Sequence, residues 1–135
     1  MAELLQVSAL TAERMDRLVL QPMSGVEELR QWLYENTFHV KTDRLVAAGS
    51  RWYQVFCVQK SLYPDPWPEG FPEGCFLVGY RSFMDRDILM GPYCARLLQK
   101  RREQLKQAVG TAGEEKLSRE AAQLEQILEG IKRCN

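Results

Sequence analysis

The 135-residue chain carries 18 lysines and arginines against 18 aspartates and glutamates, with the hydrophobic content of an ordinary globular protein. Balanced charge excludes a global field that draws a chain to nucleic acid or anionic lipid, so such contacts need a local patch. Apolar runs such as residues 75–78 are far shorter than the ~20 residues of a membrane span, and residues 1–10 lack the pattern of a signal peptide. We therefore expect one cytoplasmic protein with no membrane contact.

The N-terminal third begins with residues 2–10, which have the apolar spacing of a helix. Residues 17–21 (RLVLQ) form a short apolar run that Pro22 ends, and this pattern fits a buried strand or the end of a helix. A Ser-Gly-Val-Glu sequence at residues 24–27 matches a capping box and predicts a helix through about Asn36.

From Phe38 onward the pattern becomes that of β-strands. Residues 51–59 (RWYQVFCVQ) are rich in aromatic and β-branched side chains, which predicts a central strand with both faces covered. Residues 75–81 (CFLVGYR) predict a second buried strand. With residues 61–74 as the connection, we expect these two strands to pair antiparallel.

The connecting segment of residues 61–74 contains four prolines and a tandem of Trp-Pro-Glu-Gly and Phe-Pro-Glu-Gly turns, which excludes regular structure. Its rings Tyr63, Trp67 and Phe71 argue against disorder. Two interpretations stay open at this stage. The rings fold back to cover the sheet, or they form a contact surface for a protein partner, as in a non-enzymatic interaction module.

The C-terminal third predicts two helices. The first begins at Gly91-Pro92 and ends before Gly110, and the second opens with a capping box at residues 111–114. Apolar side chains recur at helical spacing in the first helix at Cys94, Leu97, Leu98, Leu105 and Ala108, and in the second at Leu117, Ala121, Leu124, Leu128 and Ile131.

A short turn between the helices predicts an antiparallel hairpin with a short coiled-coil seam. In that register Arg101, the one charged residue of the first stripe, lies opposite Ala121 with its head in water. Basic residues of the first helix face acidic residues of the second, and each exposed pair of this kind contributes about 0–1 kcal/mol.

The residue types that carry chemistry are sparse. His39 is the single histidine, and the catalytic pair that we consider for it is a dyad with the nucleophile Cys57. The cysteines 57, 75, 94 and 134 have no C-x-x-C spacing, and buried free thiols are expected. Asp85 and Asp87 are interpreted as capping residues, and no metal site is predicted. The chain has no glycine-rich phosphate-binding motif.

One basic run stands out on the first C-terminal helix. Its spacing allows it to follow a phosphate backbone, although the acidic second helix dilutes its field. Its members are Arg96, Lys100, Arg101, Arg102 and Lys106.

Four segments resemble one enzyme family. RLVLQP at residues 17–22, ELRQWLYEN at residues 28–36, LVAAGSRWYQVFCV at residues 45–58 and DRDILMGPY at residues 85–93 are similar to the later part of bacterial methyltransferases. These enzymes use S-adenosylmethionine to methylate a ring nitrogen of adenine in tRNA. The likeness covers most of the chain.

The resemblance implies an α/β fold: the closing half of a Rossmann-like methyltransferase sheet in residues 1–90, then a helical hairpin in residues 91–135. It implies that residues 17–21 are a strand, and that residues 51–59 and 75–81 are the antiparallel pair that closes the sheet. The glycine-rich cofactor half of the family is absent, so the chain resembles a C-terminal piece, and a sheet cut this way predicts self-association through an exposed strand edge.

The resemblance also implies functional roles. The partner is tRNA, touched by the basic residues of the first hairpin helix. S-adenosylmethionine is the cofactor of the complete enzyme, and its binding by this chain alone is doubtful. Gln21 and Pro22, at a strand end, lie on the substrate side.

Overall fold

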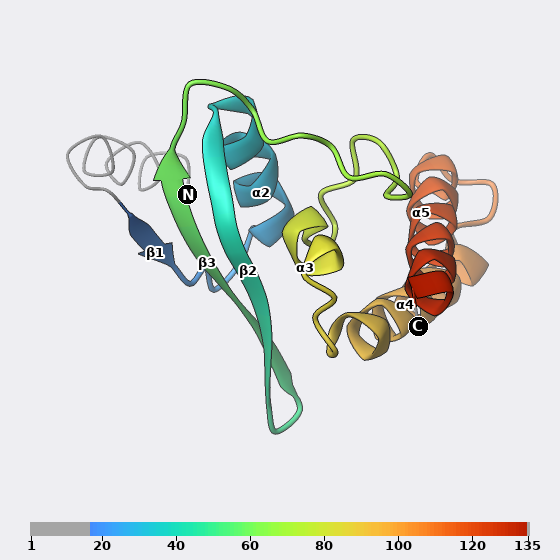
Figure 1. Cartoon of the computed structure of the whole chain (residues 1–135). Coiled ribbons are helices and arrows are strands. Elements are labelled where there is room, and N and C mark those ends of the chain that lie inside the picture. Colours follow the sequence, from blue (N-terminus) through green and yellow to red (C-terminus); the bar gives the residue numbers. More distant parts are fainter. Residues whose placement is uncertain (1–16, 135) are drawn as a thin grey trace.

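The computed structural model describes residues 17–134, which form a three-stranded antiparallel sheet, two helices beside it and a C-terminal helical hairpin (Figure 1). The strands are β1 (Leu18–Leu20), β2 (Phe38–Ala48) and β3 (Arg51–Lys60). The helices are α2 (Val26–Glu35), α3 (Tyr80–Met84), α4 (Met90–Ala108) and α5 (Glu114–Cys134). The helix predicted for residues 2–10 lies outside the described residues.

The sheet has the order β1-β3-β2, with both neighbouring pairs antiparallel. Residues 18–20 form β1, so the ambiguous apolar run is a strand, as the resemblance implied. Strands β2 and β3 form a long hairpin that extends past the short β1 (Figure 1). Phe56 and Val58 of β3 are fully buried, whereas Tyr53, Val55 and Cys57 on the other face are half-buried. The central position of β3 was therefore predicted, but only one of its faces is fully covered.

A β-bulge in β2 sets which of its side chains enter the core. The register with β3 shifts between Val40 and Thr42, so the extra residue Lys41 interrupts the strict alternation of faces. As a result Asp43 and Leu45 stay on the buried face, together with Val40. The bulge thus brings a carboxylate into the interior.

The predicted strand of residues 75–81 is wrong. Residues 75–79 are buried except for the half-buried Phe76, but they are irregular, and α3 begins at Tyr80. The partner of β3 is β2, not this segment. The carbonyl oxygens of Phe76 and Leu77 accept hydrogen bonds from the Arg30 side chain at 3.2 and 3.3 Å, so a guanidinium satisfies backbone groups that a neighbouring strand would otherwise pair.

An ion pair between Arg30 of α2 and Asp43 of β2 lies in the core. Arg30 Nε donates to Asp43 Oδ2 at 2.8 Å and Nη2 donates to Oδ1 at 3.3 Å, and both side chains are 2% exposed. The guanidinium carbon also lies 5.2 Å from the centre of the Phe56 ring. Residue 30 was not predicted to be buried, and its charge is instead compensated by this fork-shaped contact.

The backbone passes very close to the ion pair at Gly79. A Cβ at this position would collide with the Asp43 carboxylate and lie 3.1 Å from Ser82 Oγ. Only glycine therefore fits at this crossing. The Ser82 hydroxyl donates to the Asp43 carbonyl oxygen, which ties α3 to the same point of β2.

Side chains from outside the sheet bond the outer edge of β2. Val40 N donates to Asp65 Oδ2 at 3.0 Å, and Leu45 N donates to Asp87 Oδ2 at 3.1 Å. Together with the Ser82 contact, these bonds occupy edge groups that would otherwise attract another strand. In the described part of the chain, no strand pairs with the far edge of β1.

One hydrophobic core joins the sheet, the connecting segments and the hairpin. Leu29 and Leu33 of α2 share it with Met90, Cys94 and Leu98 of α4, and the buried α5 members are Ala121, Leu124 and Ile127. The predicted division at residues 90 and 91 stays a prediction, since the core crosses it. Within residues 17–134 no helix combines the length and apolarity that a bilayer crossing requires.

The helical hairpin is present, but its caps differ from those predicted. Glu114 Oε2 accepts from Gly110 N at 2.9 Å, and Thr111 Oγ1 donates to Ala108 O at 2.6 Å, so the reciprocal Thr-Glu box is wrong. The box at residues 24–27 is also wrong. Gly25 caps α2 with a φ of 65°, and no side chain bonds to that helix start.

Removing either partner of the Arg30–Asp43 pair is expected to destabilise the fold. Arg30→Met or Asp43→Leu alone leaves one buried charge unpaired and lowers the free energy of unfolding by about 3–5 kcal/mol. The double variant loses less free energy of unfolding than the two single variants combined, because neither charge remains buried. Urea unfolding followed by circular dichroism measures all three, and strictly additive losses would contradict the buried pairing.

Candidate functional site

A groove lies at the end of β1 and joins residues from four parts of the chain. It encloses about 340 Å³. Its wall contains Pro22 just after β1, Val26 at the start of α2, the start of β3 from Arg51 to Gln54, and the first half of α4. Pro22, predicted for the substrate side, therefore lines the groove, whereas Gln21 is exposed beside it and does not.

The rim of the groove is basic. Arg51, Arg96 and Lys100 all line it and are exposed to solvent. Among the described residues that line this groove, none is acidic. The structure thus brings two members of the predicted basic run next to Pro22, with Arg51 of β3 as a third cation. This local field can exist although the chain as a whole is neutral.

Aromatic rings line the inner part of the groove. The Trp52 and Tyr93 rings are 5.3 Å apart between centroids and tilted by 49°, and Tyr53 also lines the groove. Burial raises the pKa of Tyr93, so its hydroxyl keeps its proton at neutral pH. The aromatic wall is therefore a pair of rings contributed by β3 and α4.

Gln54 connects to this wall from the sheet. Its side-chain Nε2 donates to Tyr93 Oη at 2.9 Å, which fixes the tyrosine. The residue is 6% exposed, and its Oε1 is buried without a hydrogen-bond partner among the described residues. An unpaired buried acceptor of this kind costs about 1–3 kcal/mol. It is therefore a candidate contact for a ligand that brings an N–H group.

The other residues of the basic run point elsewhere. Arg102 and Lys106 line a different groove, between α4 and Leu128 of α5, and Arg102 pairs with Glu125 at 2.9 Å. The Arg102–Glu125 pair confirms the complementary charges predicted for the hairpin. The five basic residues therefore do not form one surface.

Arg101 contradicts the prediction of a head group in water. Its side chain is 20% exposed, and Nε lies 3.5 Å from Glu120 Oε2, beyond good hydrogen-bond geometry. The cause is the position of Glu120, which is itself buried on α5 beside the seam. Arg101 therefore belongs to the contact between α4 and α5, and it is a poor candidate for RNA binding.

Glu27 of α2 shares the charged environment of this contact. Burial, followed by the carboxylates of Glu120 and Glu28, raises its pKa, while Lys116 and Arg101 act in the opposite direction. The ionised form of Glu27 is thus destabilised in the folded protein.

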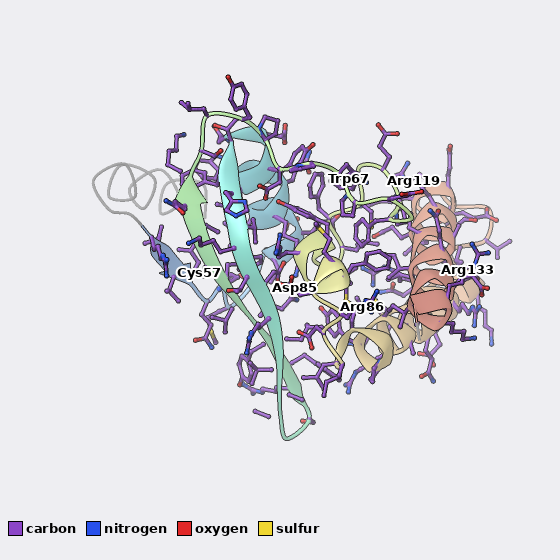
Figure 2. All side chains as sticks on the ribbon, in the orientation of Figure 1. Cys57, Trp67, Asp85, Arg86, Arg119 and Arg133 are labelled. Carbon is purple, nitrogen blue, oxygen red and sulfur yellow. The ribbon has the colours of Figure 1, made fainter. Side chains whose placement is uncertain are left out.

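The structure favours the interpretation that the rings of the connecting segment fold back on the protein, for two of its three rings, and the partner-binding role stays a prediction. Phe71 is 4% exposed, and Trp67 packs against Tyr34 and Tyr80 with centroids 5.4 and 5.5 Å away. Trp67 is labelled in Figure 2 on the segment that runs from β3 toward α5. Its Nε1 donates to Phe71 O at 3.1 Å, so this segment closes on itself. Only Tyr63 remains exposed, at 75%.

The histidine has a structural partner. His39 Nδ1 is bonded to Asp65 Oδ1 at 2.7 Å, and Asp65 Oδ2 also accepts from Tyr80 Oη at 2.9 Å. Burial and the adjacent Asp65 carboxylate raise the pKa of Tyr80 well above its usual range. In the described residues no hydrogen bond joins His39 to Cys57, so the weighed dyad gains no support.

The thiols follow the prediction where the structure describes them. Cys75 and Cys94 are buried and free, and Cys57 is half-buried. Burial raises the pKa of Cys94 to about 12 and raises that of Cys75 as well. Neither buried thiol forms the thiolate that a nucleophile requires at neutral pH.

The two aspartates beside Arg86 have separate structural partners. Asp85 pairs with Arg81 at 3.2 Å, and Asp87 Oδ1 accepts from Leu89 N at 3.0 Å ahead of α4. Figure 2 labels Asp85 and Arg86 at the end of α3. Residues 17–134 hold no cluster of three or more histidine, cysteine, aspartate or glutamate side chains suited to a metal ion.

Comparisons with known proteins relate this architecture to methyltransferases. A family model described as a methyltransferase domain matches residues 1–56. No curated protein matches the chain. Solved structures match 87–95% of it.

Three of these structures carry informative descriptions. A putative tRNA (m1A22) methyltransferase of Streptococcus pneumoniae, in complex with S-adenosyl-L-methionine, matches with a TM-score of 0.72 and 15% identity over 95% of this chain and 54% of that one. The TrmK of M. capricolum, in complex with S-adenosyl-homocysteine, matches with a TM-score of 0.75 and 14% identity over 95% of this chain and 55% of that one. The m1A22 tRNA methyltransferase TrmK of B. subtilis matches with a TM-score of 0.59 and 20% identity over 87% of this chain and 50% of that one.

The chain has the fold of these methyltransferases. The resemblance in the four sequence segments is thereby confirmed, and so are the predicted α/β class and C-terminal hairpin. The chain spans about half the length of the solved structures it matches. Identities of 14–20% establish the shared fold.

Sequence reasoning missed the inner part of the groove. It read Trp52 as a core residue and singled out neither Gln54 nor Tyr93. Two signals were available. Gln54 is a polar residue that shares the inward face of β3 with Phe56 and Val58. Tyr93 precedes Arg96 by three residues and Lys100 by seven on one helix, so the three share a face.

The connecting segment is expected to contribute to stability. Phe71→Ala should lower the free energy of unfolding by about 3–5 kcal/mol, because it empties a buried ring site. Tyr63→Ala is the matched control and should change it by less than about 0.5 kcal/mol, since that ring is exposed. Urea unfolding decides between them, and equal small effects would restore the interpretation of the rings as a contact surface.

Glu27→Gln is expected to stabilise the protein near neutral pH. Because the pKa of Glu27 is raised in the folded state, the folded chain holds this proton more tightly, and stability falls as pH rises from the ordinary value of 4.5 through the raised pKa. The gain from Gln should therefore vanish at lower pH, where both states are protonated. Melting temperatures across pH test this, with Glu35→Gln on exposed helix surface as the control. A gain that is independent of pH would contradict it.

Proposed function

We propose that this chain is the C-terminal portion of an S-adenosylmethionine-dependent tRNA adenine methyltransferase, and that its groove faces tRNA. One observation carries the proposal. In a chain with the fold of tRNA methyltransferases, the end of β1 at Pro22 and the cations Arg96 and Lys100 line the same groove.

The position of the groove agrees with the general behaviour of α/β sheets. In the complete, mostly parallel sheet that we propose, ligands bind outside the carboxyl ends of the parallel strands, although the described strand pairs are antiparallel and β3 reaches the groove with its amino end. Pro22 follows the carboxyl end of β1, and the groove begins there. Exposed arginine and lysine side chains supply the non-specific attraction to phosphate on which most RNA binding depends. The α4 residues thus provide the tRNA contact that we infer.

The cofactor belongs to the complete enzyme in this proposal. S-adenosylmethionine supplies the methyl group when it is bound. The described residues do not fit it by themselves, because the single glycine between β1 and α2, Gly25, serves as a helix cap, and the sequence has no glycine-rich motif. The chemistry of methyl transfer is therefore assigned to a partner half of the sheet.

The remaining organisation follows from the same proposal. Residues 1–90 contribute to the catalytic sheet and residues 91–135 form the helical hairpin, in a cytoplasmic protein. No strand of residues 17–134 pairs with the far edge of β1, which supports association with a second copy when the chain is alone, and the concentration dependence of its sedimentation tests this. The alternative, a protein-binding module built on the connecting segment, has less support because Phe71 is buried in the core and the partly buried Trp67 packs against it.

Charge reversal in the groove is expected to weaken tRNA binding. The double variant Arg96→Glu/Lys100→Glu should reduce affinity and lower the slope of log affinity against log salt by about 2, one for each lost phosphate contact. Filter binding of unmodified tRNA over a salt series measures both quantities.

The matched control is Arg102→Glu/Lys106→Glu, which makes the same change in net charge on the other side of α4. It should alter the slope much less. Arg101 is left unchanged, because its contact with Glu120 makes it part of the hairpin packing. If both double variants weaken binding equally, overall charge governs the interaction and the groove is not the tRNA surface.

A further inference from the structure

The groove holds more than a basic rim, and its inner wall is suited to a flat ring. The Trp52 and Tyr93 rings lie 5.3 Å apart, and Gln54 holds the tyrosine by its hydroxyl. Aromatic side chains in nucleic-acid-binding grooves commonly serve as stacking platforms for unpaired bases. A wall of this kind adds nothing to the binding of a base-paired phosphate backbone.

Gln54 supplies a second, independent observation. It lines the groove, is buried, and leaves Oε1 without a partner in the described structure. A carbonyl oxygen accepts from N–H groups, such as the exocyclic amine of a base. The tyrosine beside it keeps its hydroxyl proton, which gives the wall a donor as well.

The basic rim of the groove favours a negatively charged ligand. Three cations and no acidic residue line the described groove, so an anionic group is favoured there. A ligand that combines a flat ring, an N–H donor and a negative charge is a nucleotide. An acidic peptide matches the rim but not the ring wall.

Building on the proposed function, we propose that the groove takes one unpaired nucleotide of the RNA, with its base against Trp52 and Tyr93, its amine toward Gln54 Oε1, and its phosphate at Arg51, Arg96 and Lys100. The site then distinguishes an unpaired base from a continuous duplex. The base bound in this groove contributes to positioning the RNA, and the methyl-accepting atom is not assigned to it.

The first experiment uses the unmodified full chain and two RNAs of equal length, so that no variant has to fold. One is a short unstructured oligoadenylate, and the other is the same ribose-phosphate chain without bases. Fluorescence anisotropy should give an affinity higher for the oligoadenylate by about 5-fold to 150-fold, the range of one stacked base. Equal affinity for the two RNAs overturns the proposal. The proposal is also overturned if oligoglutamate displaces the oligoadenylate as readily as the base-free RNA does.

The second experiment locates the effect. Trp52→Leu should remove most of the preference for bases, whereas Trp52→Phe retains a ring and should preserve it. Gln54→Met should narrow the preference for oligoadenylate over an oligomer of purine riboside, whose bases lack the amine. Melting temperatures check that each variant is folded. A base preference that survives in folded Trp52→Leu places the base elsewhere and overturns the assignment.

The two proposals fail differently. If charge reversal at Arg96 and Lys100 leaves tRNA binding intact while the base preference persists, the proposed tRNA surface and the phosphate contact at these two residues both fail, and only the base contact with Trp52 and Tyr93 stands. If charge reversal weakens tRNA binding but the base-free RNA binds equally well, the nucleotide site fails alone.

Discussion

The buried contact between Arg30 and Asp43 is the constraint on which the rest of the structure depends. It joins α2 to β2 and, through the same guanidinium, holds the carbonyl groups of Phe76 and Leu77. A buried ion pair adds little net stability over a well-packed apolar pair, because both charges lose their hydration. Its consequence here is geometric: the apolar segment of residues 75–79 crosses Asp43 without joining the sheet, and Gly79 makes the close approach possible.

The crossing determines where the hairpin begins, and hence where the groove forms. After Gly79, α3 is tied to the edge of β2 by Ser82, and the following turn is tied to it by Asp87. Helix α4 starts immediately afterward, with Met90 and Cys94 in the core. Since these contacts set the first turns of α4, they also set Tyr93 and Arg96 beside Trp52 and Pro22. The site is thus a product of packing around an edge strand.

Local pattern predicted those elements whose neighbours agree with their periodicity. Helix α2, strand β3 and the two hairpin helices follow from apolar spacing, and the resemblance assigned β1. Residues 75–81 failed because a buried apolar run has the same composition whether its carbonyl groups are paired with a strand or with an arginine. The capping boxes failed because Gly25 and Gly110 supply the turns themselves, through a positive φ that side-chain spacing does not reveal.

The candidate site was predicted in its charges but not in its geometry, and helix periodicity explains both outcomes. Arg96 and Lys100 are four residues apart and share one face, as do Arg102 and Lys106, but the two pairs point in different directions at 3.6 residues per turn. Arg101 lies between them and meets Glu120, while Glu125 neutralises Arg102. The acidic helix α5 thus cancels part of the basic run and leaves the groove side without a described carboxylate. A neutral chain therefore has a positive surface at this groove, and that surface lies where the aromatic wall begins.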